Sequence, residues 1–210
     1  MITFCVIGLT AQNEEVFTKR PLQKTTVKLS ITSFLEYPPV FEPGVEFRLG
    51  PQSSLNMHVG ATGINYGPDI GAWFVRSKNE FRFYINEFGN KEQNLCFIGI
   101  EGTYRYQKET RTEWLSRFGG AFLQEYKFNR FRNVASLFVN YGWQSKGTNS
   151  RFVTDYKIGI GYRFHKLTQN IPDDVEGNFR VIIPSVVNNV GSYTYPMINF
   201  IIAGGYIAKQ

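Results

Sequence analysis

The sequence predicts an all-β fold: an eight-stranded antiparallel up-and-down transmembrane β-barrel with a polar, side-chain-filled lumen. Three observations favour it: segments in which apolar and polar residues alternate, a composition rich in Phe, Tyr and Gly, and short turns that alternate with longer connections. The chain of 210 residues contains 19 Phe, 12 Tyr and 20 Gly, a mixture that favours strands and turns over helices. At this length one barrel domain is expected.

The clearest alternation runs through residues 152–164, FVTDYKIGIGYRF. Successive side chains of a strand point to opposite sides, so this segment has an aromatic and aliphatic face and a face of charges and glycines. The first face contains Phe152, Thr154, Tyr156, Ile158, Ile160, Tyr162 and Phe164, and the second contains Val153, Asp155, Lys157, Gly159, Gly161 and Arg163. In a membrane barrel the first face meets lipid and the second meets the lumen.

Seven further segments alternate in the same way and complete the set of eight strands. The eight expected strands are 26–34, 41–50, 55–63, 79–88, 95–106, 134–144, 152–164 and 197–208. Tilted strands of nine to eleven residues cross a bilayer, and these segments have that length. The apolar stretch 119–128 is interpreted as an extended arm of the sixth strand.

The connections between these strands differ in length in a regular way. GPQSS, GNKEQN and SKGTNS are short and polar, whereas the third, fifth and seventh strands are followed by long connections, the last covering residues 166–196. Such alternation is typical of barrels with short periplasmic turns and longer external loops. Residues 110–120 are expected to form an amphipathic turn at the membrane surface or a plain loop.

The polar faces predict a structural network of lumen charges. Because leaving one charge buried and alone costs several kcal/mol, carboxylates should stand opposite basic groups, and the lumen glycines 44, 99, 142, 159 and 161 should make room for long Arg and Tyr side chains. The predicted network consists of Glu46, Arg48, His58, Glu80, Arg82, Glu101, Arg105, Asp155, Lys157 and Arg163.

Aromatic residues near the strand ends predict a girdle at the edges of the membrane. Tyr and Trp rings concentrate at such interfaces because one part of the ring is apolar and another is polar. The predicted girdle consists of Tyr104, Tyr106, Tyr141, Trp143, Phe164 and Tyr206.

The N-terminus is interpreted as an export signal. Residues 2–9 are apolar and are followed by Ala11 and a polar stretch, as in a secretory signal peptide. We expect a signal peptide at 1–11 that is incomplete at its N-terminus because it lacks a basic region, a periplasmic lead-in at 12–25, and a barrel at 26–208.

Several kinds of chemistry find no support in the sequence. The net charge is +6, but Lys and Arg are scattered, so no nucleic-acid partner is expected. Cys5 and Cys96 form no CxxC pair, and no metal or cofactor is expected. His58 is expected to pack in the lumen near Asn56, and His165 to lie at the rim in a solvated or interfacial position. No catalytic residue is predicted, and the protein is not expected to be an enzyme.

Six segments together resemble the strands of a known family: VEFRLGPQSSLNMHVG, NEFRFYIN, LCFIGIEGTYRY, NVASLFVNYGWQ, TDYKIGIGYRF and MINFIIAGGYIA. The chain is similar over residues 26–208 to small outer-membrane β-barrels of unknown function from Bacteroidetes, an OmpA/OmpX-like and DUF3575-like family. The resemblance implies the barrel fold and the outer membrane of Gram-negative cells, and it implies no catalytic or ligand residues. Outer-membrane lipids, lipopolysaccharide and the outer-membrane assembly machinery are the partners expected of such a chain, which should be a monomer.

The expected role is structural, loop-presenting or adhesive, with no wide pore because eight strands leave a lumen just wide enough for side chains. Three alternatives remain open at this point: a narrow channel or small-ligand transporter, a lipid-modifying outer-membrane enzyme, and a soluble secreted lipocalin-like ligand-binding barrel.

Overall fold

A computed structural model describes residues 25–35, 39–65, 70–85, 94–118, 120–146, 151–171, 175–176 and 191–208. The predicted signal peptide, and the lead-in as far as residue 24, lie outside the described residues. No helix among the described residues is long and apolar enough to cross a membrane.

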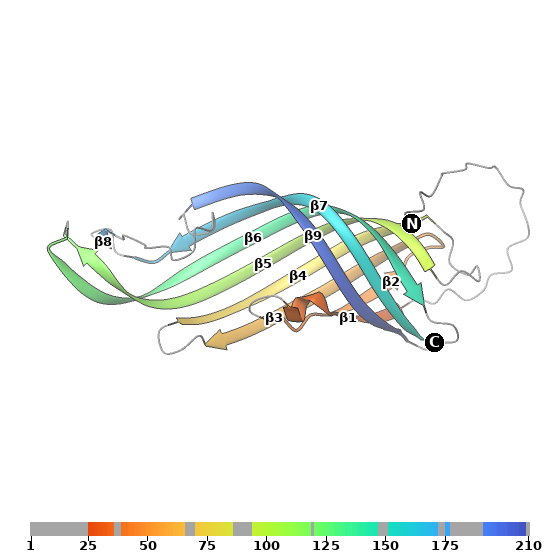
Figure 1. The fold of residues 1–210 in the computed structure, drawn as a ribbon, viewed down its shortest axis with the longest axis horizontal. Coiled ribbons are helices and arrows are strands. Elements are labelled where there is room, and N and C mark those ends of the chain that lie inside the picture. Colours follow the sequence, from red (N-terminus) through yellow and green to blue (C-terminus); the bar gives the residue numbers. More distant parts are fainter. Residues whose placement is uncertain are drawn as a thin grey trace, which may run out of the picture.

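Eight of the described strands form one closed antiparallel ring (Figure 1). Each strand pairs with the next one in the sequence, and pairing of the first with the last, such as Thr26 with Ile207, closes the ring. In ring order the strands are β1 (Thr25–Ser30), β2 (Pro43–Arg48), β3 (Ser53–Asn65), β4 (Ile70–Tyr84), β5 (Asn94–Arg117), β6 (Phe122–Lys146), β7 (Phe152–Gln169) and β9 (Gly191–Ile207). The predicted all-β, eight-stranded, up-and-down architecture is confirmed.

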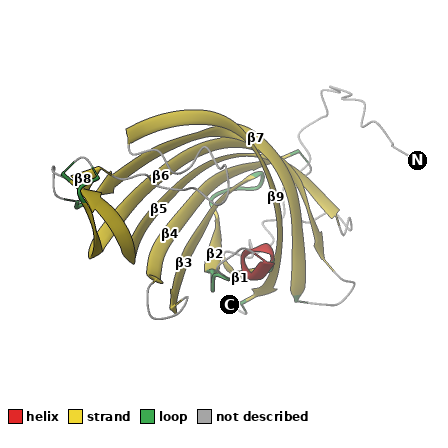
Figure 2. Cartoon of the chain, turned by 60° about the vertical axis from the view of Figure 1, so that its left-hand side comes forward, coloured by secondary structure: helices red, strands yellow, loops and turns green. Residues whose placement is uncertain are grey.

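The wall of the ring is much longer on one side than on the other. β1 and β2 have six residues each, and the short helix η1 (Thr32–Leu35) follows β1. β5 and β6 have 24 and 25 residues. Figure 2 shows the strands curving round into the ring, with η1 near β1 and β9. We call the end where β1 starts and β9 finishes the terminal end, and the opposite end the loop end.

The prediction of a long connection between the fifth and sixth strands is wrong. β5 and β6 continue as a paired hairpin almost to their turn, beyond the last partners that β4 and β7 supply, Ile70 and Gln169. We call residues 112–127 of this hairpin the arm; Figure 1 shows it projecting past the other strands. The two-residue strand β8 (Val175–Glu176) pairs with its tip.

Part of this hairpin escaped prediction because its sequence lacks apolar alternation. Residues 107–113, QKETRTE, are polar at both sets of alternating positions, so no contrast between two faces marks them as a strand. Residues 110–120 therefore belong mainly to β5 rather than to an amphipathic turn. Residues 122–128 are part of β6, in agreement with the interpretation of 119–128 as an arm of the sixth strand. The connection between the third and fourth strands is also shorter than predicted, because β3 extends to Asn65 and β4 begins at Ile70.

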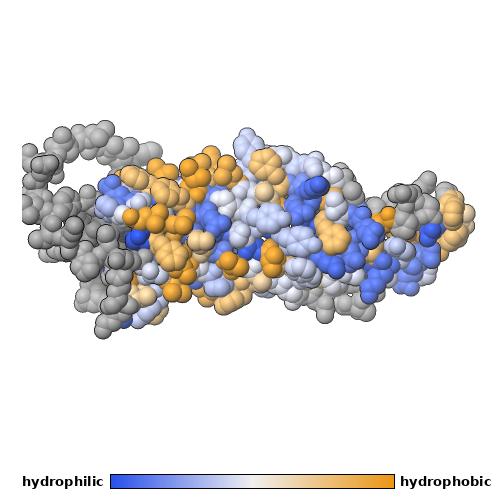
Figure 3. Space-filling model, turned by 180° about the vertical axis from the view of Figure 1, so that it is seen from behind, coloured by the Kyte–Doolittle hydropathy of each residue, from blue (hydrophilic) through white to orange (hydrophobic). Residues whose placement is uncertain are grey.

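Side chains along the central strands alternate between buried polar and exposed apolar residues. Arg82 and Asp155 are 1% and 3% exposed, whereas Phe81 and Ile158 are 48% and 50% exposed. The buried positions point into the ring and the exposed ones point away from it. Figure 3 shows hydrophobic atoms gathered over the half nearer the terminal end and hydrophilic atoms over much of the half that carries the arm.

Candidate functional site

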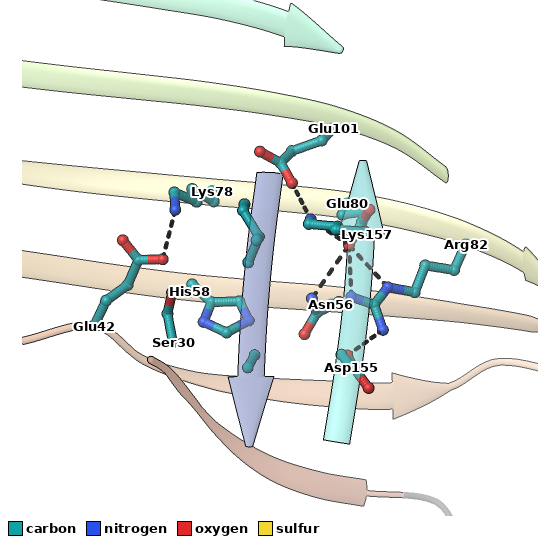
Figure 4. A pocket seen from close by; sticks show the side chains of 12 residues that line it. Ser30, Glu42, Asn56, His58, Lys78, Glu80, Arg82, Glu101, Asp155 and Lys157 are labelled. Atoms are coloured by element: carbon teal, nitrogen blue, oxygen red, sulfur yellow. Dashed lines mark hydrogen bonds and ion pairs between the residues drawn. The ribbon is translucent and has the colours of Figure 1, made fainter. Parts of the chain in front are cut away.

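The centre of the ring contains a cluster of buried ion pairs from β1, β2, β4 and β7. The Lys28 ammonium contacts the carboxylates of Glu46 and Asp155. Arg82 Nη1 lies 2.7 Å from Asp155 Oδ2, and Arg82 Nη2 lies 2.8 Å from Glu80 Oε2 (Figure 4). All five side chains are at most 3% exposed, so each charge is withdrawn from solvent and matched by at least one opposite charge.

A second part of the cluster surrounds Lys157. Its ammonium contacts the Glu101 carboxylate and lies 2.9 Å from Glu80 Oε2. The Asn140 amide donates to Glu80 Oε1 at 2.8 Å and to Glu101 Oε2 at 3.3 Å. The Lys157 ammonium on β7 and the Asn140 amide on β6 thus both contact the two carboxylates on β4 and β5.

Several ion pairs join strands that are not neighbours, such as Lys28 with Asp155 and Lys157 with Glu80. The register places Glu80 opposite Glu101, and Arg76 opposite Arg105. Like charges directly opposite each other destabilise a strand pair, so the expectation that carboxylates stand opposite basic groups is wrong for these two positions. The charges are matched from farther round the ring because an eight-stranded barrel is narrow enough for long side chains to meet across it.

The terminal end is closed by polar and aromatic side chains. Tyr84 donates to Glu46 at 2.5 Å, and Gln144 donates to Glu46 and Asp155 at 3.1 and 2.9 Å. Arg48 donates to Gln144 at 2.9 Å and lies over the Tyr84 ring. These contacts fill the ring between the central ion pairs and the terminal end.

Inward-facing glycines make this packing possible. A Cβ on Gly99 would lie 2.7 Å from Glu80 Oε1, and one on Gly44 would overlap the imidazole of His58. A Cβ on Gly142 or Gly159 would meet Phe97 or Asn140 in the same way. At these positions the glycines make room for His, Glu, Phe and Asn, and not for the Arg and Tyr side chains that were expected.

A third group of charges lies nearer the loop end. The Glu42 carboxylate contacts Arg76 and lies 2.8 Å from Lys78 Nζ. His58 is 7% exposed and lines the same small cavity as Glu42 and Lys78 (Figure 4). That cavity measures about 10 Å³, about the room one water molecule needs.

Four members of these groups were missing from the predicted network: Lys28, Glu42, Arg76 and Lys78. Lys28 alternates with Val27 and Leu29, and Glu42 shares a face with Glu46, so the period of two could have found both. Arg76 and Lys78 were missed because the fourth strand was expected to start at residue 79, whereas β4 starts at Ile70.

The remaining predicted lumen residues, Arg105 and Arg163, lie on the inner wall near the loop end. Arg105 donates to Gln107, and its guanidinium lies 3.9 Å from the centre of the Phe74 ring. Arg163 Nε donates to Ser136 Oγ at 3.4 Å. Neither belongs to the central cluster.

His165 does not lie at a solvated rim as expected, because β7 continues for four residues beyond it. It is 4% exposed, and its ring stacks on Tyr193 with 4.6 Å between centroids. Its side chain therefore faces the inside of the ring, away from the exposed surface.

The predicted girdle residues lie near the two edges of the exposed apolar surface. Tyr141, Trp143 and Tyr206 lie toward the terminal end, where Trp143 stacks on Tyr156 at 5.3 Å. Tyr104 and Phe164 are exposed toward the loop end. Tyr106 is half-buried against Trp73, with 5.6 Å between ring centroids.

The arm has an apolar tip and begins beside a group of charges on β5. Arg111 bridges Glu109 at 3.1 Å and Glu113 at 3.4 Å. At the tip, apolar side chains are between 49% and 67% exposed: Trp114, Phe118, Phe122 and Leu123. This patch was not predicted, because residues 110–120 were expected to form a turn or loop and not a strand that pairs with residues 119–128.

Ser54 takes part in the contacts that fill the ring. Ser54, which lies two strand positions from Asn56, donates to Glu46 and not to a histidine. Within the described ranges, His, Cys, Asp and Glu side chains form no group of three that could hold a metal ion. What the interior does hold is a set of matched charges that fills the ring.

The fold and its interior define a class of protein: a closed up-and-down β-barrel of eight strands, packed inside with charged and polar side chains. Within that class, the chain belongs to the family described as "Protein of unknown function (DUF3575)", whose model matches residues 1–177. The predicted family is thereby confirmed. No curated protein and no solved structure matches the chain.

Proposed function

We propose that this protein is an outer-membrane β-barrel without a wide pore that holds the arm outside the cell as a structural or adhesive element. The observation that carries the proposal is the inverted sidedness of the ring, which has matched charges inside and apolar side chains outside. The arm and its exposed apolar tip support the adhesive role.

The outer surface has the character of a lipid-facing belt. One row of aligned outward residues crosses five strands, and every member is at least 48% exposed: Phe81, Ile100, Val139, Ile160 and Ile198. Exposed apolar surface of this extent is rare on soluble monomers. It is favourable in a bilayer, where the closed ring also satisfies all backbone groups.

The two ends of the barrel support one orientation in the membrane. The start of β1, the end of β9 and the short β2–β3 turn, residues 49–52, lie at the terminal end, and the arm lies at the loop end. Outer-membrane barrels have short turns on the periplasmic side and longer structures outside. In the orientation that we propose, the arm tip is outside the cell, where it can contact another surface. Lipopolysaccharide and outer-membrane lipids would surround a monomeric barrel inserted by the assembly machinery.

The interior weighs against a channel and against a soluble ligand-binding barrel. The cavity among the central ion pairs has room for about one water molecule, so a solute would have to break several buried ion pairs to pass. A lipocalin-like barrel needs an apolar interior, whereas Glu46, Glu80 and Arg82 occupy this one. No observation favours a lipid-modifying enzyme.

The proposal is tested by fractionation and by surface labelling. The protein should be found in the outer-membrane fraction and migrate differently on a gel before and after heating. Leu123→Cys, at the arm tip, should react with a membrane-impermeant maleimide on intact cells in a Cys96→Ser background. Pro51→Cys, in the β2–β3 turn, is the matched control and should react only after lysis. A soluble protein, or labelling of Pro51→Cys on intact cells, would overturn the proposal.

A further inference from the structure

We infer that the loop end of the interior contains a binding site for a phosphate group, made by Arg105, Arg132 and Arg163 with His165 and Tyr193. The inference goes beyond the proposed function and does not depend on it, because binding can be measured on the purified barrel.

Three strands place these arginines in adjacent inward rows. The register aligns Arg105 with Val134, His165 and Tyr193 in one row across β5, β6, β7 and β9. Arg163 lies in the next inward row toward the terminal end, opposite Ser136, and Arg132 lies in the next row toward the loop end, opposite Leu167. His165 therefore has one arginine in its own row and one in each adjacent inward row.

The charge balance of this region differs from that of the central cluster. In these three rows the inward positions of β4, β5, β6, β7 and β9 hold five cations and no carboxylate. Glu42 contacts two of the cations, Arg76 and Lys78. Glu101 lies nearer the centre, in contact with Lys157. Glu109 lies nearer the arm, 3.1 Å from Arg111 and 4.0 Å from Arg132. At the described inward positions of these rows, basic residues therefore outnumber carboxylates.

Buried polar atoms beside these arginines lack partners among the described residues. Both ring nitrogens of His165 are buried without a hydrogen bond, and so is the Tyr193 hydroxyl. His165 is 96% buried, and its stacking on Tyr193 holds both groups beside the arginines. Leaving a buried polar group unsatisfied costs free energy, which a bound oxyanion would recover by accepting hydrogen bonds from the imidazole N–H and the phenol.

Phosphate fits this set of donors best. Guanidinium groups form paired hydrogen bonds to phosphate oxygens, and three cations on different strands match a compact group with two negative charges. The phosphate can come from a free phosphate ester or from a lipid headgroup. The headgroup is a realistic source because a pocket of about 290 Å³ in the same wall is lined by His165 and Tyr193 together with the exposed Tyr104 and Phe164.

The test uses the full-length barrel in phosphate-free detergent micelles. The chain has two histidines, so imidazole NMR signals report on His165, with His58 as an internal control and His165→Gln for assignment. Inorganic phosphate should shift the His165 signals in a saturable way and leave those of His58 in place. Arg132→Gln and Arg163→Gln should each weaken binding about tenfold, since each removes a charge-assisted hydrogen bond. Arg163→Lys should weaken it less, and Arg117→Gln, on the arm, should have no effect.

Two further titrations identify the source of the phosphate. A shift with a sugar phosphate supports a free ester, and a shift only in micelles containing phosphatidic acid supports a lipid headgroup. Phosphatidylcholine micelles are the control for the detergent environment. Gel migration before and after heating shows that each variant is folded. An equal shift with chloride, no saturable shift with any phosphate, or undiminished binding by both folded Arg→Gln variants would overturn the inference.

Discussion

Glu80 and Glu101 face each other directly on β4 and β5, and both carboxylates contact the Lys157 ammonium from the other side of the ring. Two like charges at paired positions should repel and weaken the pairing of their strands. Here a cation from β7 and the Asn140 amide from β6 offset that repulsion. Correct pairing of β4 with β5 therefore depends on β6 and β7 being in place.

Replacing Lys157 with Met should destabilise the barrel strongly. The change leaves two buried carboxylates without their shared cation, and breaking a buried ion pair in this way costs about 3–5 kcal/mol. The measurement is urea unfolding in lipid vesicles. Lys146→Met, at an exposed lysine near the terminal end, is the control and should change the free energy of unfolding by less than about 0.5 kcal/mol. Equal stability of the two variants would contradict the role of Lys157.

Gly99→Ala should destabilise the barrel, and Gly102→Ala should not. A Cβ at Gly99 would lie 2.7 Å from Glu80 Oε1, whereas a Cβ at Gly102 on the same strand would meet nothing within 4 Å. Inserting a methyl group into packed surroundings costs about 1–3 kcal/mol. Urea unfolding of both variants tests this, and similar losses at the two positions would mean that the space beside Glu80 is not filled as described.

An arginine at the arm tip should leave the stability of the barrel unchanged, whereas an arginine on the lipid-facing belt should lower it. Ile160 and Leu123 are 68% and 67% exposed, so the two positions differ in location and not in accessibility. If Ile160 faces lipid, Ile160→Arg should cost about 2–4 kcal/mol near the bilayer midplane, and Leu123→Arg should cost nothing measurable. Folding yield into vesicles and urea unfolding provide the measurement. A harmless Ile160→Arg would argue against a transmembrane belt.

The apolar tip of the arm should be needed for attachment and not for folding. Trp114→Ser combined with Leu123→Ser removes two large exposed side chains and leaves the ring unchanged. We expect normal migration before and after heating, normal surface display, and reduced attachment of cells that express the variant. Attachment equal to wild type would leave the barrel with a structural role alone.

The alternation of side chains along the sequence determined much of this protein. It identified all eight strands of the ring, and it placed Glu46, Glu80 and Asp155 on the faces opposite their apolar neighbours. Alternation is a local property, because each residue's side follows from its place in the strand and from the period of two. For the same reason it failed on residues 107–113, where both faces are polar and no contrast marks a strand.

Only the tertiary structure decided which charges meet. Lys157 reaches Glu80 and Glu101 across the ring, and Lys28 contacts Asp155 although 127 positions separate them. These partners depend on the register of every strand pair and on closure of β1 against β9. The separation of charges in space is set by the ring as a whole, and no short stretch of the sequence contains that information.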